Sequence, residues 1–466
     1  MHRSLARANA DKALVCGTAP GNDLVCAVFH RDYPGDTVLE TAPVSRLVVY
    51  DGGNGATVYR PTVATFSDHD ALVCYGLATA NFRVQCRALK LGGSYSHKPV
   101  DDAGEKSRLT LSAGPVLGLG NGIYEHSVAT LDASGAPYAW AARRALICYN
   151  ENFGGRPAKC RSLALSFPPK SDGTPGEDGN SPGILTAGPT TTIFPGSNAA
   201  AYPGVRFPTK QVLSTFDYFN AIVCYTTPIS FRDPVFPFTA TFWYFGVGRC
   251  STISVDVATG SLVTAGDTQT FSAEGVRVHD VVVSAFKSKS GDPTRALFCY
   301  TTATTTGNYR VGYTTDVRCN VASRSGTGIT YLNSQRTADG EASAGVSKEE
   351  VYSFYDGKDG VSTANWRPNE LTLDTTDEYN AVVCTSKRDT FEANQPRCSS
   401  PSFGCNVGNG NIAWPSPIGG YLECRHLFIE GWGSSTYNSD VFNGIESGRD
   451  RTSRPRPPPP THMMPT

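Results

Sequence analysis

A short apolar run that ends at a cysteine recurs six times along the 466-residue chain, and this repetition restricts the fold more than any other feature of the sequence. The six copies begin at Ala13, Ala71, Ala145, Ala221, Ala296 and Ala381. Successive copies therefore start 58 to 85 residues apart, and a regular period of this kind is typical of a repeat architecture. We expect one extended domain without a linker, because repeats can lengthen a single domain to this size.

Each repeat of about 75 residues contains four runs with the composition of β-strands. An apolar run such as residues 63–66 comes first, the Ala-Leu-Val-Cys run second, another run with a cysteine third, and a run such as Leu185–Pro189 fourth. β-branched and aromatic residues dominate these runs, Gly, Pro, Asp and Ser separate them, and no stretch keeps a period of 3.6. The sequence predicts an all-β fold.

The second run of each repeat is apolar at almost every position, which is typical of a strand buried on both faces. Four-stranded antiparallel sheets that pack face to face around an axis would bury it in this way, as the blades of a β-propeller do. We therefore predict a six-bladed β-propeller over residues 1–446. Seven blades or a β-solenoid are the alternatives, although solenoid coils are shorter than this repeat. Residues 447–466 are rich in Arg and Pro and predict a disordered tail.

Twelve of the fourteen cysteines form one pair in each repeat, and this regularity predicts structural disulfides. On the propeller hypothesis each pair joins the second and third strands of one blade. Zinc-site spacings are absent from the sequence, and the alternative is that the cysteines are small buried residues of a cytosolic repeat protein. The predicted disulfide cysteines are Cys16, Cys26, Cys74, Cys86, Cys148, Cys160, Cys224, Cys250, Cys299, Cys319, Cys384, Cys398, Cys405 and Cys424.

The last four cysteines allow two pairings. Cys384 can pair with Cys398, the next cysteine along the chain, or with Cys424, whose surroundings match the third strand of the other repeats better. In the second case Cys398 and Cys405 would close a local loop.

The predicted disulfides indicate the compartment of the protein, and its charge argues against some classes of partner. Persistent disulfides imply an oxidising setting, either extracellular or in the secretory lumen. The 41 basic and 42 acidic residues nearly cancel, which argues against a nucleic-acid or anionic membrane partner, and no apolar run is long enough to cross a bilayer. Residues 1–7 lack an apolar signal region, and we expect that the N-terminus of the sequence is incomplete.

The repeat resembles a tandem repeat of largely uncharacterised secreted or surface proteins of algae, other protists and bacteria. The resemblance covers about residues 1–430. It is clearest in the third copy, at residues 127–132, 145–149, 160–163 and 185–189. The resemblance implies a β-propeller of unknown activity and supplies no catalytic residues. This chain departs from the pattern in its long inserts, and Gly17 and Thr385 stand where the other copies have tyrosine.

Three long inserts are candidate functional loops, because binding residues of a fixed scaffold tend to lie on loops. Residues 168–180 carry oxygen ligands that could hold Ca²⁺, but they lack the spacing and terminal glutamate of an EF-hand loop, and a mobile acidic loop is the preferred explanation. A segment that contains Phe236, Phe238, Trp243 and Tyr244 could stack against a sugar or contact a protein, or fold back on its own blade. The charged insert 348–369 predicts a solvated loop.

No catalytic, cofactor or metal residues are predicted from sequence motifs. Nucleophile-elbow, zinc-protease and phosphate-loop motifs are absent from the sequence. His69, His126 and His279 lie near the first strands of three repeats and could converge on one rim, but their offsets differ.

We therefore expect an extracellular or cell-surface binding or structural module, with a glycan or protein as its ligand and with unknown oligomeric state. The alternative is a secreted propeller hydrolase that acts on glycans, because propeller enzymes can assemble their acids from several blades.

Overall fold

The computed structural model shows a chain built almost entirely of antiparallel β-strands. The structure describes residues 3–7, 12–30, 40–78, 82–92, 110–131, 137, 141–151, 157–168, 181–194, 211–228, 246–256, 258–261, 263–272, 277–286, 294–304, 313–331, 352–353, 368–375, 380–387 and 421–428. In this part of the chain the only helical pieces are two short 3-10 turns, η1 (Gly52–Asn54) and η2 (Ala141–Arg143). None of the described helical pieces could span a membrane.

The strands follow the six repeats, and each repeat forms one sheet in chain order. Sheet 1 consists of β1 (Arg3–Arg7), β2 (Lys12–Thr18), β3 (Leu24–His30) and β4 (Glu40–Tyr50); sheet 2 of β5 (Thr57–Thr65), β6 (Asp70–Ala78), β7 (Arg83–Gly92) and β8 (Thr110–Asn121); sheet 3 of β9 (Ile123–Thr130), β10 (Arg144–Glu151), β11 (Ala158–Ser166), β12 (Ile184–Ala187) and β13 (Thr191–Phe194). Sheet 4 consists of β14 (Gln211–Thr215), β15 (Asn220–Pro228), β16 (Gly246–Val255) and β17 (Val263–Thr270); sheet 5 of β18 (Arg277–Ala285), β19 (Arg295–Thr304), β20 (Tyr313–Ser325), β21 (Gly328–Tyr331) and β22 (Tyr352–Ser353); sheet 6 of β23 (Pro368–Thr375), β24 (Asn380–Lys387) and β25 (Tyr421–Phe428). Sheets 4 and 5 are joined into one by a single residue pair, Gly246 and Val278.

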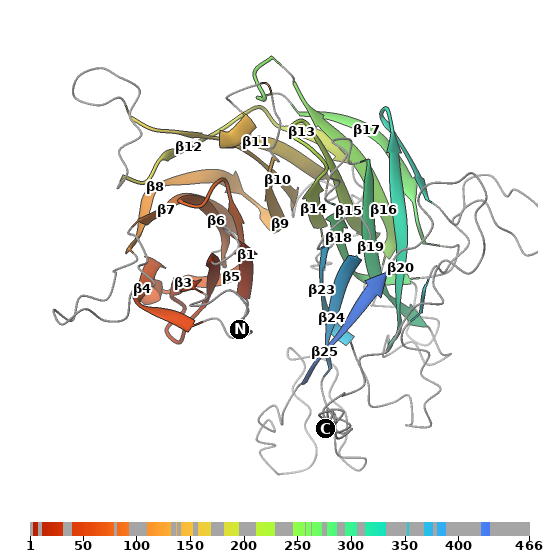
Figure 1. Ribbon diagram of the computed structural model, residues 1–466, viewed down its shortest axis with the longest axis horizontal. Helices are drawn as coiled ribbons and strands as arrows, with labels where there is room; N and C mark the ends of the chain where they lie inside the picture. The colour runs from red at the N-terminus through yellow and green to blue at the C-terminus, as the bar shows by residue number, and fades with distance from the viewer. Residues whose placement is uncertain are drawn as a thin grey trace, which may run out of the picture.

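The sheets pack against one another in chain order, with their first strands along one side of the stack. The first strands contact in the series β1, β5, β9, β14, β18 and β23, and outer strands β4 and β8, β8 and β12, and β17 and β21 also contact. Figure 1 shows the sheets following one another along an arc from β1 to β25. This is the blade arrangement of a β-propeller, so the predicted all-β fold with four-stranded antiparallel blades is confirmed. A closed ring of six blades remains a prediction.

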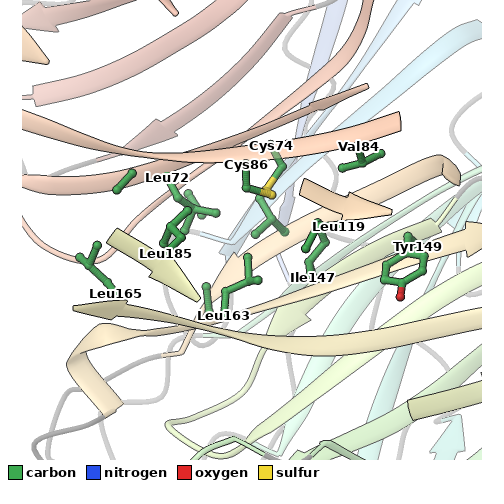
Figure 2. Packing of buried hydrophobic residues seen from close by; sticks show 14 of the residues in the cluster. Leu72, Cys74, Val84, Cys86, Leu119, Ile147, Tyr149, Leu163, Leu165 and Leu185 are labelled. Carbon is green, nitrogen blue, oxygen red and sulfur yellow. A yellow bond between two sulfur atoms is a disulfide. The ribbon is translucent and has the colours of Figure 1, made fainter. Parts of the chain in front are cut away.

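Five apolar cores fill the five junctions between neighbouring sheets. Figure 2 shows the core between sheets 2 and 3, where Leu72 and the Cys74–Cys86 disulfide of one sheet meet Ile147 and Leu163 of the next. Second-strand residues of sheets 2 to 5 are fully buried from both sides, as predicted; examples are Leu72 and Val73, or Leu146 and Ile147. The second strand of sheet 1 differs, because Val15 is only half-buried.

Five disulfides tie the second strand of sheets 1 to 5 to the third strand. They join Cys16 to Cys26, Cys74 to Cys86, Cys148 to Cys160, Cys224 to Cys250 and Cys299 to Cys319. Their Cα atoms lie 4.0 to 4.1 Å apart at directly opposed positions, a separation typical of non-hydrogen-bonded pairs. Each disulfide belongs to the core that faces the next sheet along the chain.

In sheet 6 the strand register places residue 384 directly opposite residue 424. This is the arrangement of the bonded cysteines in the other sheets, and it favours the pairing of Cys384 with Cys424 over that with Cys398. Cys398 and Cys405 lie outside the described residues.

Threonine hydroxyl groups on the first strands of sheets 2, 3, 4 and 6 link each of these sheets to the one before it. Thr65 Oγ1 donates to the Arg7 carbonyl oxygen at 2.7 Å, and Thr130 Oγ1 donates to the Thr65 carbonyl oxygen at 2.8 Å. Thr215 repeats this bond to Thr130 and Thr375 repeats it to Ala285. The bonds explain why threonine recurs at the end of the first strand, where carbonyls at the inner edge need donors.

Candidate functional site: a groove between sheets 2 and 3

A groove of about 460 Å³ lies between sheets 2 and 3, at the end of the first strands where Thr65 and Thr130 lie. Sheet 2 contributes four residues of the β5–β6 turn and the end of β7, and sheet 3 contributes η2 and the end of β11; the turn residues are Phe66, Ser67, His69 and Asp70. The groove therefore belongs to the junction whose core is drawn in Figure 2.

The turn at one side of the groove is held by hydrogen bonds around Ser67. The backbone N–H groups of His69 and Asp70 donate to Ser67 Oγ at 3.2 and 3.1 Å, and Ser67 Oγ itself donates to Asp70 Oδ2 at 3.1 Å. The Leu91 N–H donates to the His69 carbonyl oxygen at 2.7 Å and ties the turn to the end of β7. These bonds fix the position of the Asp70 carboxylate.

Asp70 and Lys90 form an ion pair at the wall of the groove. They lie directly opposite each other on β6 and β7, and Lys90 Nζ is 3.0 Å from Asp70 Oδ1. The Lys90 side chain is only 9% exposed and the Asp70 side chain 17%. Burial of a lysine is costly unless a counter-charge satisfies it, so Asp70 is what allows a cation at this depth.

The ring of Phe167 lies beside two cations. Lys90 Nζ is 5.6 Å and the Arg143 guanidinium carbon 5.2 Å from the ring centroid, both within the range of cation–π attraction. Phe167 thus orients Arg143, which reaches the groove from η2 of the next sheet.

The charged pair is peculiar to this junction. Residues at the matching register positions are Lys12 and His30, Arg144 and Ala164, Asn220 and Ser254, Arg295 and Ser323, and Asn380 and Phe428. Among the described strands, sheet 4 keeps the closest counterpart, a neutral bond in which Ser254 Oγ donates to Asn220 Oδ1 at 2.8 Å. The groove is therefore an individual site on a repeated scaffold.

The described lining of the groove combines charged and apolar side chains. It carries one acidic and two basic side chains, next to His69 and the apolar rings of Phe66 and Phe167. Asp70 is the one carboxylate among the described lining residues, and it is held by Lys90 and Ser67.

A second polar cluster lies towards the opposite end of the first strands. Glu125 and His126 of β9 are almost fully buried, and Arg60 of β5 pairs with Glu125. Both ring nitrogens of His126 lack a hydrogen-bond partner of ordinary geometry within the described part of the chain. Burial lowers the pKa of His126 to about 4; the Cys74 backbone opposes this shift and Arg60 adds to it.

The sequence-predicted candidates have different outcomes. His69 lines the groove and His126 lies in the buried cluster at the other end of the strands, so the hypothesis that the histidines converge is wrong for these two. Phe236, Phe238, Trp243, Tyr244 and residues 169–180 lie outside the described residues, as does most of 348–369. No group of three potential metal ligands occurs among the residues that are described.

Sequence reasoning missed the groove, because its residues come from four separate segments. One signal was present: only the second repeat has an acidic residue just before its Ala-Leu-Val-Cys run and a lysine at the opposite end of its third strand.

No protein-family model and no curated protein matches the chain. Solved structures similar to it include a neuraminidase-like protein of A/flat-faced bat/Peru (TM-score 0.34, 8% identity, 70% of this chain and 72% of that chain) and a mutant of the Aleuria aurantia lectin in complex with Fucalpha1-6GlcNAc (0.34, 9%, 84% and 88%). An exo-inulinase from Aspergillus awamori is similar at a TM-score of 0.31 and 10% identity, over 77% of this chain and 60% of that chain. Likenesses of this level carry no conclusion about activity.

Proposed function

We propose that this protein is an extracellular or cell-surface binding module that holds a glycan in the groove between sheets 2 and 3. The observation that carries the proposal is the set Asp70, Lys90, Arg143 and Phe167, in which two cations lie beside an aromatic ring and one of them is paired with a carboxylate. Ligand sites commonly combine apolar surface with a few placed polar groups in this way. The five disulfides support an oxidising compartment.

The charge of the groove favours glycans that carry a carboxylate or a sulfate group. The described lining has two basic side chains, Lys90 and Arg143, and one acidic side chain, Asp70. Arginine binds carboxylate and oxyanion groups through a planar pair of donors, and such charge-assisted bonds are stronger than neutral ones. Arg143 would face the acid group, while Asp70 and Ser67 would meet sugar hydroxyls.

A glycan array tests the proposal. It should contain neutral polysaccharides, uronic-acid polysaccharides and sulfated polysaccharides, together with a reducing-end assay for turnover. Binding to acidic members without turnover is the expected result. Absence of binding to any member would contradict the glycan proposal, and turnover would replace a binding module by the alternative hydrolase.

The aromatic segment that contains Phe236, Phe238, Trp243 and Tyr244 remains a second predicted contact. Its ligand would be a sugar or a protein, and this is a separate hypothesis from the groove.

A further inference from the structure

His69 is bonded twice to Leu91, the residue that follows Lys90 on β7. The Leu91 N–H donates to the His69 carbonyl oxygen at 2.7 Å, and the His69 ring nitrogen Nδ1 lies 3.2 Å from the Leu91 carbonyl oxygen. The first bond holds the backbone of the β5–β6 turn, and the second holds the imidazole ring. His69 is exposed and lines the groove, so its ring is held where a ligand can reach it.

The bond to Leu91 determines which nitrogen of the neutral His69 ring carries the proton. A carbonyl oxygen can only accept, so Nδ1 must be the donor. Nε2 of the neutral ring is then an acceptor with a lone pair, whereas Nε2 of the charged ring carries a proton and donates. The oxygens of a carboxylate or sulfate group only accept as well. Such an oxygen is therefore repelled by Nε2 of the neutral ring and bound by Nε2 of the charged ring.

The fold does not require a histidine at this position of the turn. Phe219 takes the place of His69 in sheet 4, because Asn220 begins β15 as Asp70 begins β6. The corresponding turn of sheet 4 keeps the backbone bond, in which the Val255 N–H donates to the Phe219 carbonyl oxygen at 2.8 Å. A phenylalanine therefore forms the same turn without a bond from its ring, and the imidazole of His69 is available for binding.

The charged groups around His69 favour an acidic ligand. Lys90 of β7 and Arg143 of η2 line the same groove. Two carboxylates belong to the same turn as His69: Asp70 is already paired with Lys90, and Asp68 is exposed and does not line the groove. A charged His69 therefore adds a third cation to the described lining, beside a single carboxylate that already has a counter-charge.

We propose that His69 is a further ligand contact of the groove, which binds the acid group of the glycan only when the imidazole is charged. This role rests on the proposed function of the groove and adds its regulation: acidic glycans bind more tightly as the pH falls from about 7.5 to about 5.5, the range in which a histidine side chain gains its charge. Neutral glycans offer no oxyanion to the charged ring, so their affinity changes little. The groove thus separates acidic from neutral glycans more sharply in an acidic medium.

Affinities measured at about pH 5.5 and about pH 7.5 test the role of His69. Dextran sulfate and polygalacturonate are the probes, because their sulfate and carboxylate groups keep their charge at both pH values. Wild-type protein should bind at least one of them about fivefold more tightly at the lower pH, as expected when one charge-assisted contact is added. His69→Phe, which places the phenylalanine of the sheet 4 turn in sheet 2, should lose this difference. Other titrating groups, such as His126, are present in both proteins and cancel in the comparison.

The outcomes separate the role of His69 from the proposed function. Equal affinities of wild-type protein at the two pH values, or the same pH dependence in His69→Phe, would overturn the role of His69 and leave the glycan site in place. Absence of binding at both pH values would contradict the proposed function and the role of His69 with it.

A measurement without a glycan keeps the inference testable if His69→Phe does not fold, which circular dichroism would show. Nitrogen NMR spectra of the neutral His69 ring in wild-type protein should place the proton on Nδ1, because the Leu91 carbonyl oxygen accepts it. A proton on Nε2 of the neutral ring would let it donate to an acid group at any pH and would overturn the pH dependence.

Discussion

The hydroxyl of Thr215 donates a hydrogen bond to the carbonyl oxygen of Thr130, 2.9 Å away in the preceding sheet. The two residues occupy the same register position of neighbouring first strands, so the bond links repeat to repeat. It supplies a donor to a carbonyl at the inner edge of sheet 3, where no further strand of that sheet follows.

Thr215→Val should lower the free energy of unfolding by about 1 kcal/mol, because the isosteric side chain keeps the packing and loses the hydrogen bond. Thr215→Ser keeps the donor and should cost less. Thr264→Val, at an exposed position on β17, is the control for a lost surface hydroxyl. Equal urea midpoints for Thr215→Val and Thr264→Val would show that the inter-sheet bond does not stabilise the fold.

The Cys74–Cys86 disulfide should contribute about 3 kcal/mol, the value that loop-closure entropy gives for cysteines 12 residues apart. Replacing both cysteines by alanine should therefore shift the denaturation midpoint well below that of wild-type protein. Wild-type protein treated with reductant should lose more stability than the variant does, because the remaining bonds are reduced as well. If reduction of the disulfides has no effect on stability, they do not stabilise the fold.

Peptide mapping of unreduced protein should recover a peptide that joins Cys384 to Cys424. Strand register predicts this pair, since the two residues face each other as the bonded cysteines of the other sheets do. A peptide that joins Cys384 to Cys398 would contradict the register of β24 and β25.

The buried His126 should make the fold sensitive to acid. Its pKa is about 4 in the folded protein and about 6.5 in an unfolded chain, so the unfolded state takes up a proton first as the pH falls. Stability is therefore unaffected above pH 6.5 and falls between pH 6.5 and 4, by up to about 3 kcal/mol. Between pH 6.5 and 4, the free energy of unfolding should fall more steeply with decreasing pH for wild-type protein than for His126→Gln. Parallel pH profiles would show that His126 is not buried in a neutral form.

Structural features that recur in every repeat could be predicted from the sequence, and features found in a single repeat could not. The apolar runs around Leu72 and Ile147 predicted strands buried on both faces, and the cysteine spacing predicted disulfides, because packing and register recur in every unit. The half-buried Val15 and Val382 were not foreseen, since the end sheets share the motif of the inner ones but each packs on only one other sheet in the described part of the chain.

The groove could not be predicted for a different reason. Asp70 and Lys90 are neighbours only through strand register, and Arg143 joins them only because sheets 2 and 3 stack. The identical position of threonine in several first strands was visible in the sequence, but its hydrogen bonds to the preceding repeat depend on how the sheets pack.

The central claim is that the groove between sheets 2 and 3 binds an acidic glycan. Titration of an acidic polysaccharide that binds the wild-type protein should give an affinity at least about tenfold weaker for Arg143→Gln, the change expected from loss of one charge-assisted contact. The control is Arg144→Gln, because Arg144 donates a hydrogen bond to the Thr259 carbonyl oxygen at 2.9 Å and does not line the groove. This variant should bind as the wild-type protein does. Equal affinities for Arg143→Gln and Arg144→Gln would show that the glycan binds elsewhere and would contradict the account.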